Sequence, residues 1–158
     1  MWARDYLSSK ERWLEAAPAM SWQPTPVGAA QVGHGDYQET NLFFVNDRVA
    51  DVIDWDKAEP CWPVAEIVRC LDLSLRLKPD LCVAMVRGYR SVKNLSLDDL
   101  DLAAANYGYD RVHSHWLYEQ IYEAGNDRLR TFLEPGPFVP FTDRWEPLRS
   151  ILAHQSDI

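Results

Sequence analysis

The most informative segment of this chain reads His34-Gly35-Asp36-Tyr37-Gln38-Glu39-Thr40-Asn41, and the segment Val52-Ile53-Asp54-Trp55 follows it. Between them lie two apolar runs, Leu42 to Val45 and Arg48 to Ile53, joined by Asn46-Asp47. Asn46-Asp47 is a good two-residue turn for a β-hairpin. The hairpin predicts that residues 36, 41 and 54 converge at one end of a small sheet. Asp54 then lies just past the end of a strand.

Three side chains in these segments offer oxygen atoms suited to phosphoryl transfer. Asp36 is placed to accept or orient the proton of a substrate hydroxyl, while Asn41 and Asp54 offer hard oxygen ligands to Mg²⁺. Gly35 permits a tight turn, and His34 is expected to hold the loop by a hydrogen bond to its backbone. Two alternatives remain from the residues alone. Asp36 and Asn41 are also good turn formers, and two aspartates also occur as paired carboxylates in hydrolases.

The same residues carry a resemblance to a known family. The pattern His34-Gly35-Asp36, four residues, Asn41, and then Ile53-Asp54-Trp55 resembles the aminoglycoside phosphotransferase and choline kinase-like small-molecule kinases. The resemblance continues through Asp56-Lys57-Ala58 and Trp62 to Ile67, and it covers about residues 28–75. Glu66 stands where this family usually has an aspartate at the start of a helix, and it could keep a structural hydrogen bond to the catalytic loop.

The resemblance implies a fold, an activity and a set of site residues. The expected fold is α+β and mainly α-helical, namely the C-terminal lobe of a protein-kinase-like fold with a small β-hairpin. The expected activity is transfer of the γ-phosphoryl group of ATP to a hydroxyl of a small molecule. Asp36 and His34 form the expected catalytic set, and Asn41 and Asp54 the expected ligands of Mg²⁺ and its nucleotide. The acceptor is left open among aminoglycosides, choline-like amines, homoserine and related compounds.

The resemblance also implies a part that this chain lacks. Related kinases have a β-rich N-terminal lobe with a glycine-rich loop over the phosphates and a lysine on a strand. No lysine of this chain lies on a suitable strand before His34, and no glycine-rich loop precedes it. Residues 1–158 are therefore expected to be a single domain, a catalytic lobe inactive alone that pairs with a missing lobe or self-associates. The alternative is a non-catalytic binding or regulatory relic.

Composition narrows the class of protein. The formal net charge of −8 argues against a nucleic-acid partner, whose phosphates require a basic surface, and it permits a cationic substrate. No apolar run reaches the roughly 18–20 residues of a membrane span, and the first residues do not form a signal peptide. Cys61, Cys70 and Cys82 are odd in number and lack metal-ligand spacing. These features predict a cytoplasmic protein with reduced cysteines.

The remaining sequence predicts mostly helices. A short strand is expected at 30–32, after a proline-rich connector over 18–29. Ser96 and Asp99 form a helix start signal, and Gly125 is expected to end the helix that follows. The predicted helices cover 3–17, Pro63 to Leu77, Pro79 to Tyr89, Leu97 to Ala124, 126–133 and 143–153, with a turn over 134–140.

Overall fold

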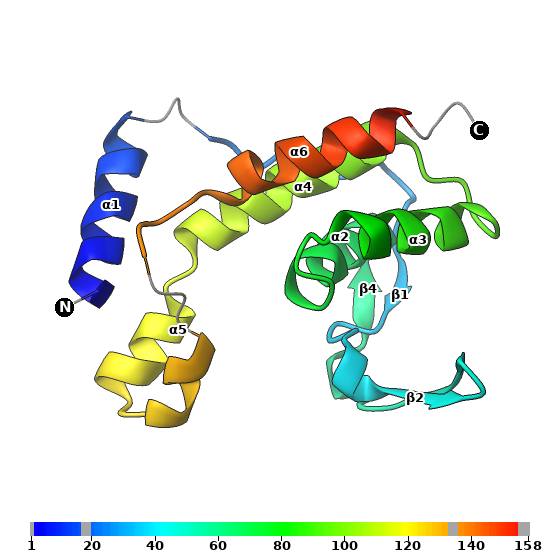
Figure 1. Cartoon of the computed structure of the whole chain (residues 1–158), viewed down its shortest axis with the longest axis horizontal. Coiled ribbons are helices and arrows are strands. Elements are labelled where there is room, and N and C mark those ends of the chain that lie inside the picture. Colours follow the sequence, from blue (N-terminus) through cyan, green and yellow to red (C-terminus); the bar gives the residue numbers. More distant parts are fainter. Residues whose placement is uncertain (1, 17–19, 133–135, 155–158) are drawn as a thin grey trace.

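A computed structural model describes residues 2–16, 20–132 and 136–154 of the chain (Figure 1). Helices dominate the described residues, and short antiparallel strands make up the rest of the regular structure. The helices are α1 (Trp2–Ala16), α2 (Pro63–Leu73), α3 (Pro79–Arg90), α4 (Leu97–His113), α5 (Trp116–Tyr118) and α6 (Phe141–His154). The strands are β1 (Gln31–Gly33), β2 (Leu42–Val45), β3 (Arg48–Val52) and β4 (Glu59–Cys61). The expected α+β, mainly helical class is therefore confirmed.

Two separate two-stranded sheets frame the segment of interest. β1 pairs antiparallel with β4, with Val32 opposite Pro60, and β2 pairs antiparallel with β3, with Leu42 opposite Val52. Asn46 and Asp47 have φ angles of 49° and 59°, the left-handed values that a tight hairpin turn requires. The predicted hairpin and the predicted strand near residue 31 are confirmed.

The core lies among the helices that follow the hairpin. α2 packs against α4, α6 lies along α4, and α3 also contacts α6 (Figure 1). α2 presents an apolar face at helical spacing, with Val68 and Leu71 fully buried. Leu100 on α4 and Leu152 on α6 complete the same cluster. This core makes α2 a firmly anchored helix, which matters because α2 also borders the loop at His34.

A buried carboxylate joins the three central helices. Asp72 of α2 accepts a hydrogen bond of 2.9 Å from the hydroxyl of Tyr107 on α4, and it pairs with Arg144 of α6. Burial, and then the charge of Asp72, raise the pKa of the Tyr107 hydroxyl, so this group stays protonated and donates. The contact fixes the relative position of α2, α4 and α6.

Two predicted helices are shorter than expected. The helix predicted from Pro63 to Leu77 ends at Leu73, because Arg76 and Leu77 adopt left-handed φ angles of 54° and 51°. The N–H of Leu77 then bonds to the carbonyl of Leu71 at 2.9 Å and closes the helix end.

The long helix predicted from Leu97 to Ala124 is interrupted. α4 ends at His113, since Ser114 has an extended backbone with ψ 124°. α5 and a π-helical turn at Glu119–Glu123 follow, and Gly125 has a φ of 69°. Serine and histidine are poor helix formers, which fits a break at this point.

Other predicted elements agree with the structure. The helices at α1, α3 and α6 are present, and Ser96 and Asp99 form the predicted capping box. The segment after Gly125 is a 3-10 turn at Asp127–Phe132. Parts of the predicted helices, connector and turn lie outside the described residues, namely residues 17–19 and 133–135. Within the described part of the chain, no helix has the length and apolar character needed to cross a membrane.

The substitution Asp72→Ala tests the contact between the central helices. It removes the partner of both Tyr107 and Arg144, so we expect the free energy of unfolding to fall by about 2–4 kcal/mol. Urea denaturation followed by tryptophan fluorescence measures this change. Glu11→Ala, at an exposed position of α1, is the control and should change stability by about 0.5 kcal/mol or less. Equal stability of the two variants would contradict the role assigned to Asp72.

Candidate active site

The loop after β1 is shaped by a glycine. Gly35 has a φ of 75°, and a Cβ atom at this position would lie 2.2 Å from the carbonyl oxygen of Lys57. Any other residue would therefore meet both backbone strain and a collision with main-chain atoms. The tight turn predicted at Gly35 is confirmed, and its cause is the close approach of the segment around Lys57.

Glu66 on α2 anchors this loop to the helical core. Its carboxylate accepts the backbone N–H of His34 at 3.1 Å and the backbone N–H of Gly35 at 2.6 Å. Hydrogen bonds to an ionised acceptor are stronger than neutral ones. The structural hydrogen bond that the sequence allowed for Glu66 is present, and the longer side chain reaches the loop where the family usually has aspartate.

His34 connects the loop to the end of the hairpin. It is buried, and its Nδ1 accepts the backbone N–H of Asp36 at 3.2 Å. The ring proton therefore lies on Nε2, which contacts the carbonyl of Ile53 at 2.8 Å and donates to it. Both nitrogens are engaged with the backbone. This arrangement gives His34 the holding role expected from the sequence and leaves neither nitrogen free for proton transfer.

Asp36 is buried and paired with two cations. Its Oδ2 contacts Nζ of Lys57 at 2.9 Å, and its Oδ1 contacts Nη2 of Arg69 at 2.9 Å. The hydrogen bond from Lys57 is the main cause that lowers the pKa of Asp36, the contact from Arg69 adds to it, and burial opposes both. The carboxylate is therefore ionised at neutral pH.

Asn41 lies beside Asp36, and the backbone links it to the segment of Asp54. The buried Asn41 side chain donates from Nδ2 to the carbonyl oxygen of Asp36 at 2.9 Å. The carbonyl of Asn41 accepts the N–H of Ile53 at 3.0 Å, which places Asp54 one residue away from that contact. Asp36 and Asn41 thus contact each other directly, and Asp54 comes one residue after a backbone contact with Asn41.

The donor atoms of Asn41 and Asp54 fit Mg²⁺. Because the amide nitrogen of Asn41 is committed to Asp36, its Oδ1 is the atom left to bind a cation. Asp54 is exposed, and its carboxylate forms no hydrogen bond or ion pair with any described residue. One amide oxygen and one carboxylate suit an ion that keeps several waters. Larger clusters of three or more His, Cys, Asp or Glu side chains that could hold a metal do not occur in the described parts of the chain.

Sequence reasoning missed two residues of this site, Lys57 and Arg69. Lys57 belongs to the segment that carries the family resemblance and lies on no strand before His34, and the sequence assigns a role neither to it nor to Arg69. One signal was present for Arg69. It lies three residues after Glu66 on a helix, so both side chains share the face that meets the loop.

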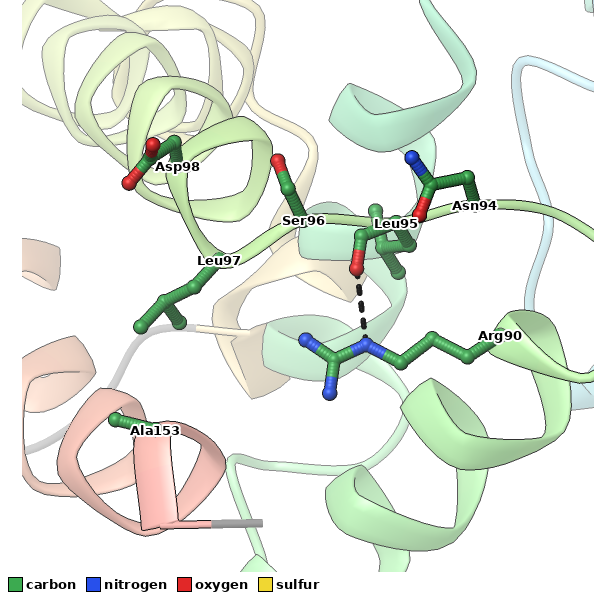
Figure 2. Close-up of a pocket in the computed structure, with 7 residues that line it drawn as sticks. All are labelled: Arg90, Asn94, Leu95, Ser96, Leu97, Asp98 and Ala153. Atoms are coloured by element: carbon green, nitrogen blue, oxygen red, sulfur yellow. Dashed lines mark hydrogen bonds between the residues drawn. The ribbon is translucent and has the colours of Figure 1, made fainter. Parts of the chain in front are cut away.

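A pocket in the structure lies away from this site. It is lined by the end of α3, the start of α4 and Ala153 of α6 (Figure 2). Arg90 donates from Nε to the carbonyl of Leu95 at 2.9 Å and holds the connecting loop across it. None of the predicted site residues lines this pocket.

The substitution Glu66→Gln tests the anchor of the loop. A glutamine side chain has one acceptor oxygen where the carboxylate has two, so one of the two loop N–H groups loses its partner. We expect hydrogen exchange of the His34 and Gly35 amides to accelerate about 10- to 100-fold, which corresponds to about 1.4–2.8 kcal/mol. Exchange followed by NMR measures it. Glu59→Gln on the exposed strand β4 is the control, and unchanged exchange at both amides in Glu66→Gln would refute the anchoring role.

Comparison with known proteins identifies the family of this chain. The phosphotransferase enzyme family, APH, matches the chain over residues 2–101, more than half of its 158 residues. No curated protein and no solved structure matches the chain significantly. The matched segment includes the loop, the hairpin and α2, and it confirms the resemblance drawn from the motifs. The chain belongs to the phosphotransferase enzyme family.

Proposed function

We propose that this chain carries the catalytic loop of a kinase that transfers the γ-phosphoryl group of ATP to a hydroxyl of a small molecule. The observation that supports this most is the single hydrogen-bonded unit formed by Asp36, Asn41 and the segment of Asp54. Phosphoryl transfer depends mainly on positioning and charge neutralisation, and these three residues supply the groups for both. Membership of the phosphotransferase enzyme family supports the same reaction class.

Asp36 acts on the acceptor hydroxyl. Since its pKa is lowered by Lys57 and Arg69, it is an ionised carboxylate and a weak base. Its main contribution is then to accept a hydrogen bond from the hydroxyl and to orient the oxygen towards the phosphoryl group. The proton moves to Asp36 as the new oxygen–phosphorus bond forms, while the bond from the γ-phosphorus to the β,γ-bridging oxygen breaks and ADP leaves.

Asn41 and Asp54 are the residues proposed to hold Mg²⁺. The cation, when bound, neutralises charge on the phosphate oxygens. The backbone N–H of Ile53 donates to the carbonyl of Asn41, so Asp54 directly follows a residue that contacts Asn41. The left-handed φ of 64° at Asp54 turns the chain immediately after the strand.

The nucleotide is proposed to be held with the help of a further lobe. β2 and β3 expose Phe43, Phe44, Val45 and Val49. A two-stranded hairpin is marginally stable alone, and an apolar one gains from being covered. We therefore propose that a nucleotide-binding lobe, from the same polypeptide or another chain, packs on this hairpin and that residues 1–158 are inactive without it.

The acceptor is proposed to be a small alcohol that carries a positive charge. The formal net charge of −8 favours cations over anions near the protein. Aminoglycosides and choline-like amino alcohols have both the hydroxyl and the charge.

A binding module without catalysis is the second candidate. The observation in its favour is that the Asp36 carboxylate is already neutralised by two cations. In this alternative the site holds a ligand and no phosphoryl group moves.

Asp36→Asn tests the kinase proposal. The full-length gene product is assayed for acceptor-dependent ADP formation with Mg-ATP and a panel of aminoglycosides and amino alcohols, next to residues 1–158 alone. We expect Asp36→Asn to lower kcat by about 100- to 10,000-fold, because the amide cannot take the proton. Asp80→Asn, at an exposed position of α3, is the control and should leave kcat unchanged.

The outcomes separate the two candidates. Full activity of Asp36→Asn would contradict the role of Asp36. Binding of Mg-ATP measured by calorimetry, with no turnover for any acceptor, would support the binding module. Turnover by residues 1–158 alone would refute the need for a further lobe.

A further inference from the structure

We propose that Arg69 is a positioning residue that fixes Oδ1 of Asp36. Only Oδ2 then changes its hydrogen-bond partner, from Lys57 to the acceptor hydroxyl. This inference rests on the proposed function, because it assigns the two oxygens of the carboxylate that the reaction uses.

The two oxygens of Asp36 have different partners. Nη2 of Arg69 contacts Oδ1, and Nζ of Lys57 contacts Oδ2, each at 2.9 Å. A carboxylate held at both oxygens has one orientation. When one of the two partners leaves, the other decides whether that orientation persists.

The two partners differ in how firmly they are held. The side chain of Lys57 is 67% exposed and extends from a short turn, whereas that of Arg69 is 31% exposed and extends from α2. An exposed lysine contact is weak, because water and side-chain entropy compete with it. Lys57 is therefore the partner that an incoming hydroxyl can displace, and Arg69 is the partner that stays.

α2 carries both Arg69, which contacts Asp36, and Glu66, which anchors the loop. Arg69 follows Glu66 by three residues, and Glu66 holds the backbone N–H groups of His34 and Gly35. One turn of α2 therefore fixes the loop twice. Glu66 accepts hydrogen bonds from the loop backbone, and Arg69 donates to the carboxylate of Asp36. Val68, between them, is fully buried in the core and holds the helix in place.

This arrangement has a chemical consequence for the reaction. Small displacements of a reacting group, on the order of 1 Å, reduce rates about 100-fold, because the reacting atoms no longer align. With Oδ1 held by Arg69, the orientation of Oδ2 does not depend on Lys57 or on the acceptor. The carboxylate is oriented before the acceptor arrives.

The χ1 rotamer of Asp36, which sets the direction in which its carboxylate extends, is measured by NMR. In ¹³C,¹⁵N-labelled protein, three-bond couplings from the backbone nitrogen and carbonyl carbon to Cγ report the χ1 rotamer. We expect single-rotamer couplings at Asp36 in the wild type, in Lys57→Gln and in Arg69→Lys. We expect rotamer-averaged couplings in Arg69→Gln. Arg76→Gln removes the same charge at an exposed position just after α2, and its couplings should match those of the wild type.

The couplings of Asp72 are the internal control for folding. They should be identical in all variants, because Asp72 is held by Tyr107 and Arg144. Single-rotamer couplings at Asp36 in Arg69→Gln would overturn the inference, and so would averaged couplings in Lys57→Gln.

Kinetics of the full-length gene product give a second readout. We expect Arg69→Gln to lower kcat about 10- to 100-fold with KM for the acceptor unchanged, and Arg69→Lys to recover most of the loss. A rise in KM with unchanged kcat would overturn the positioning role. If the wild type transfers no phosphoryl group, the proposed function is wrong, and the couplings still decide whether Arg69 holds Asp36.

Discussion

The carboxylate of Glu66 accepts hydrogen bonds from the backbone N–H groups of His34 and Gly35, and the rest of the candidate site depends on this contact. α2 is fixed by buried apolar residues and by the contact of Asp72 with α4 and α6. Through Glu66, α2 anchors a loop whose regular structure is limited to a 3-10 turn at Glu39–Asn41. The candidate catalytic loop is therefore held by one helix, whose other face belongs to the core.

From that anchor the site is assembled by short-range backbone contacts. His34 reaches the carbonyl of Ile53, and the carbonyl of Asn41 accepts the N–H of the same residue. The end of the hairpin is thereby tied to the loop at two points, both on Ile53, the residue before Asp54. Asp36 is added through the Asn41 side chain and through its own two cations. The loop, the hairpin and α2 each contribute residues to the site, and their mutual contacts hold these residues in place.

The features that sequence could predict are those decided locally. The hairpin follows from its turn residues, and the loop residues Asp36, Asn41 and Asp54 follow from their spacing. Arg69 could not be assigned to Asp36, because their contact joins residues far apart in sequence and the helix face alone does not identify its partner. The end of α2 was also missed. Left-handed backbone at Arg76 and Leu77 carries no sequence signal of the kind that glycine or asparagine gives.

Asn41 and Asp54 are proposed to share one cation site at the end of the hairpin. Mn²⁺ binds the same oxygen ligands as Mg²⁺ and broadens nearby NMR signals. Titrating Mn²⁺ into the ¹⁵N-labelled chain should first broaden the amides of residues 40–42 and 53–56, while those of α6 stay sharp. Asp54→Asn should abolish this selectivity. Broadening that is spread over the acidic surface, or that is unchanged in Asp54→Asn, would contradict the account.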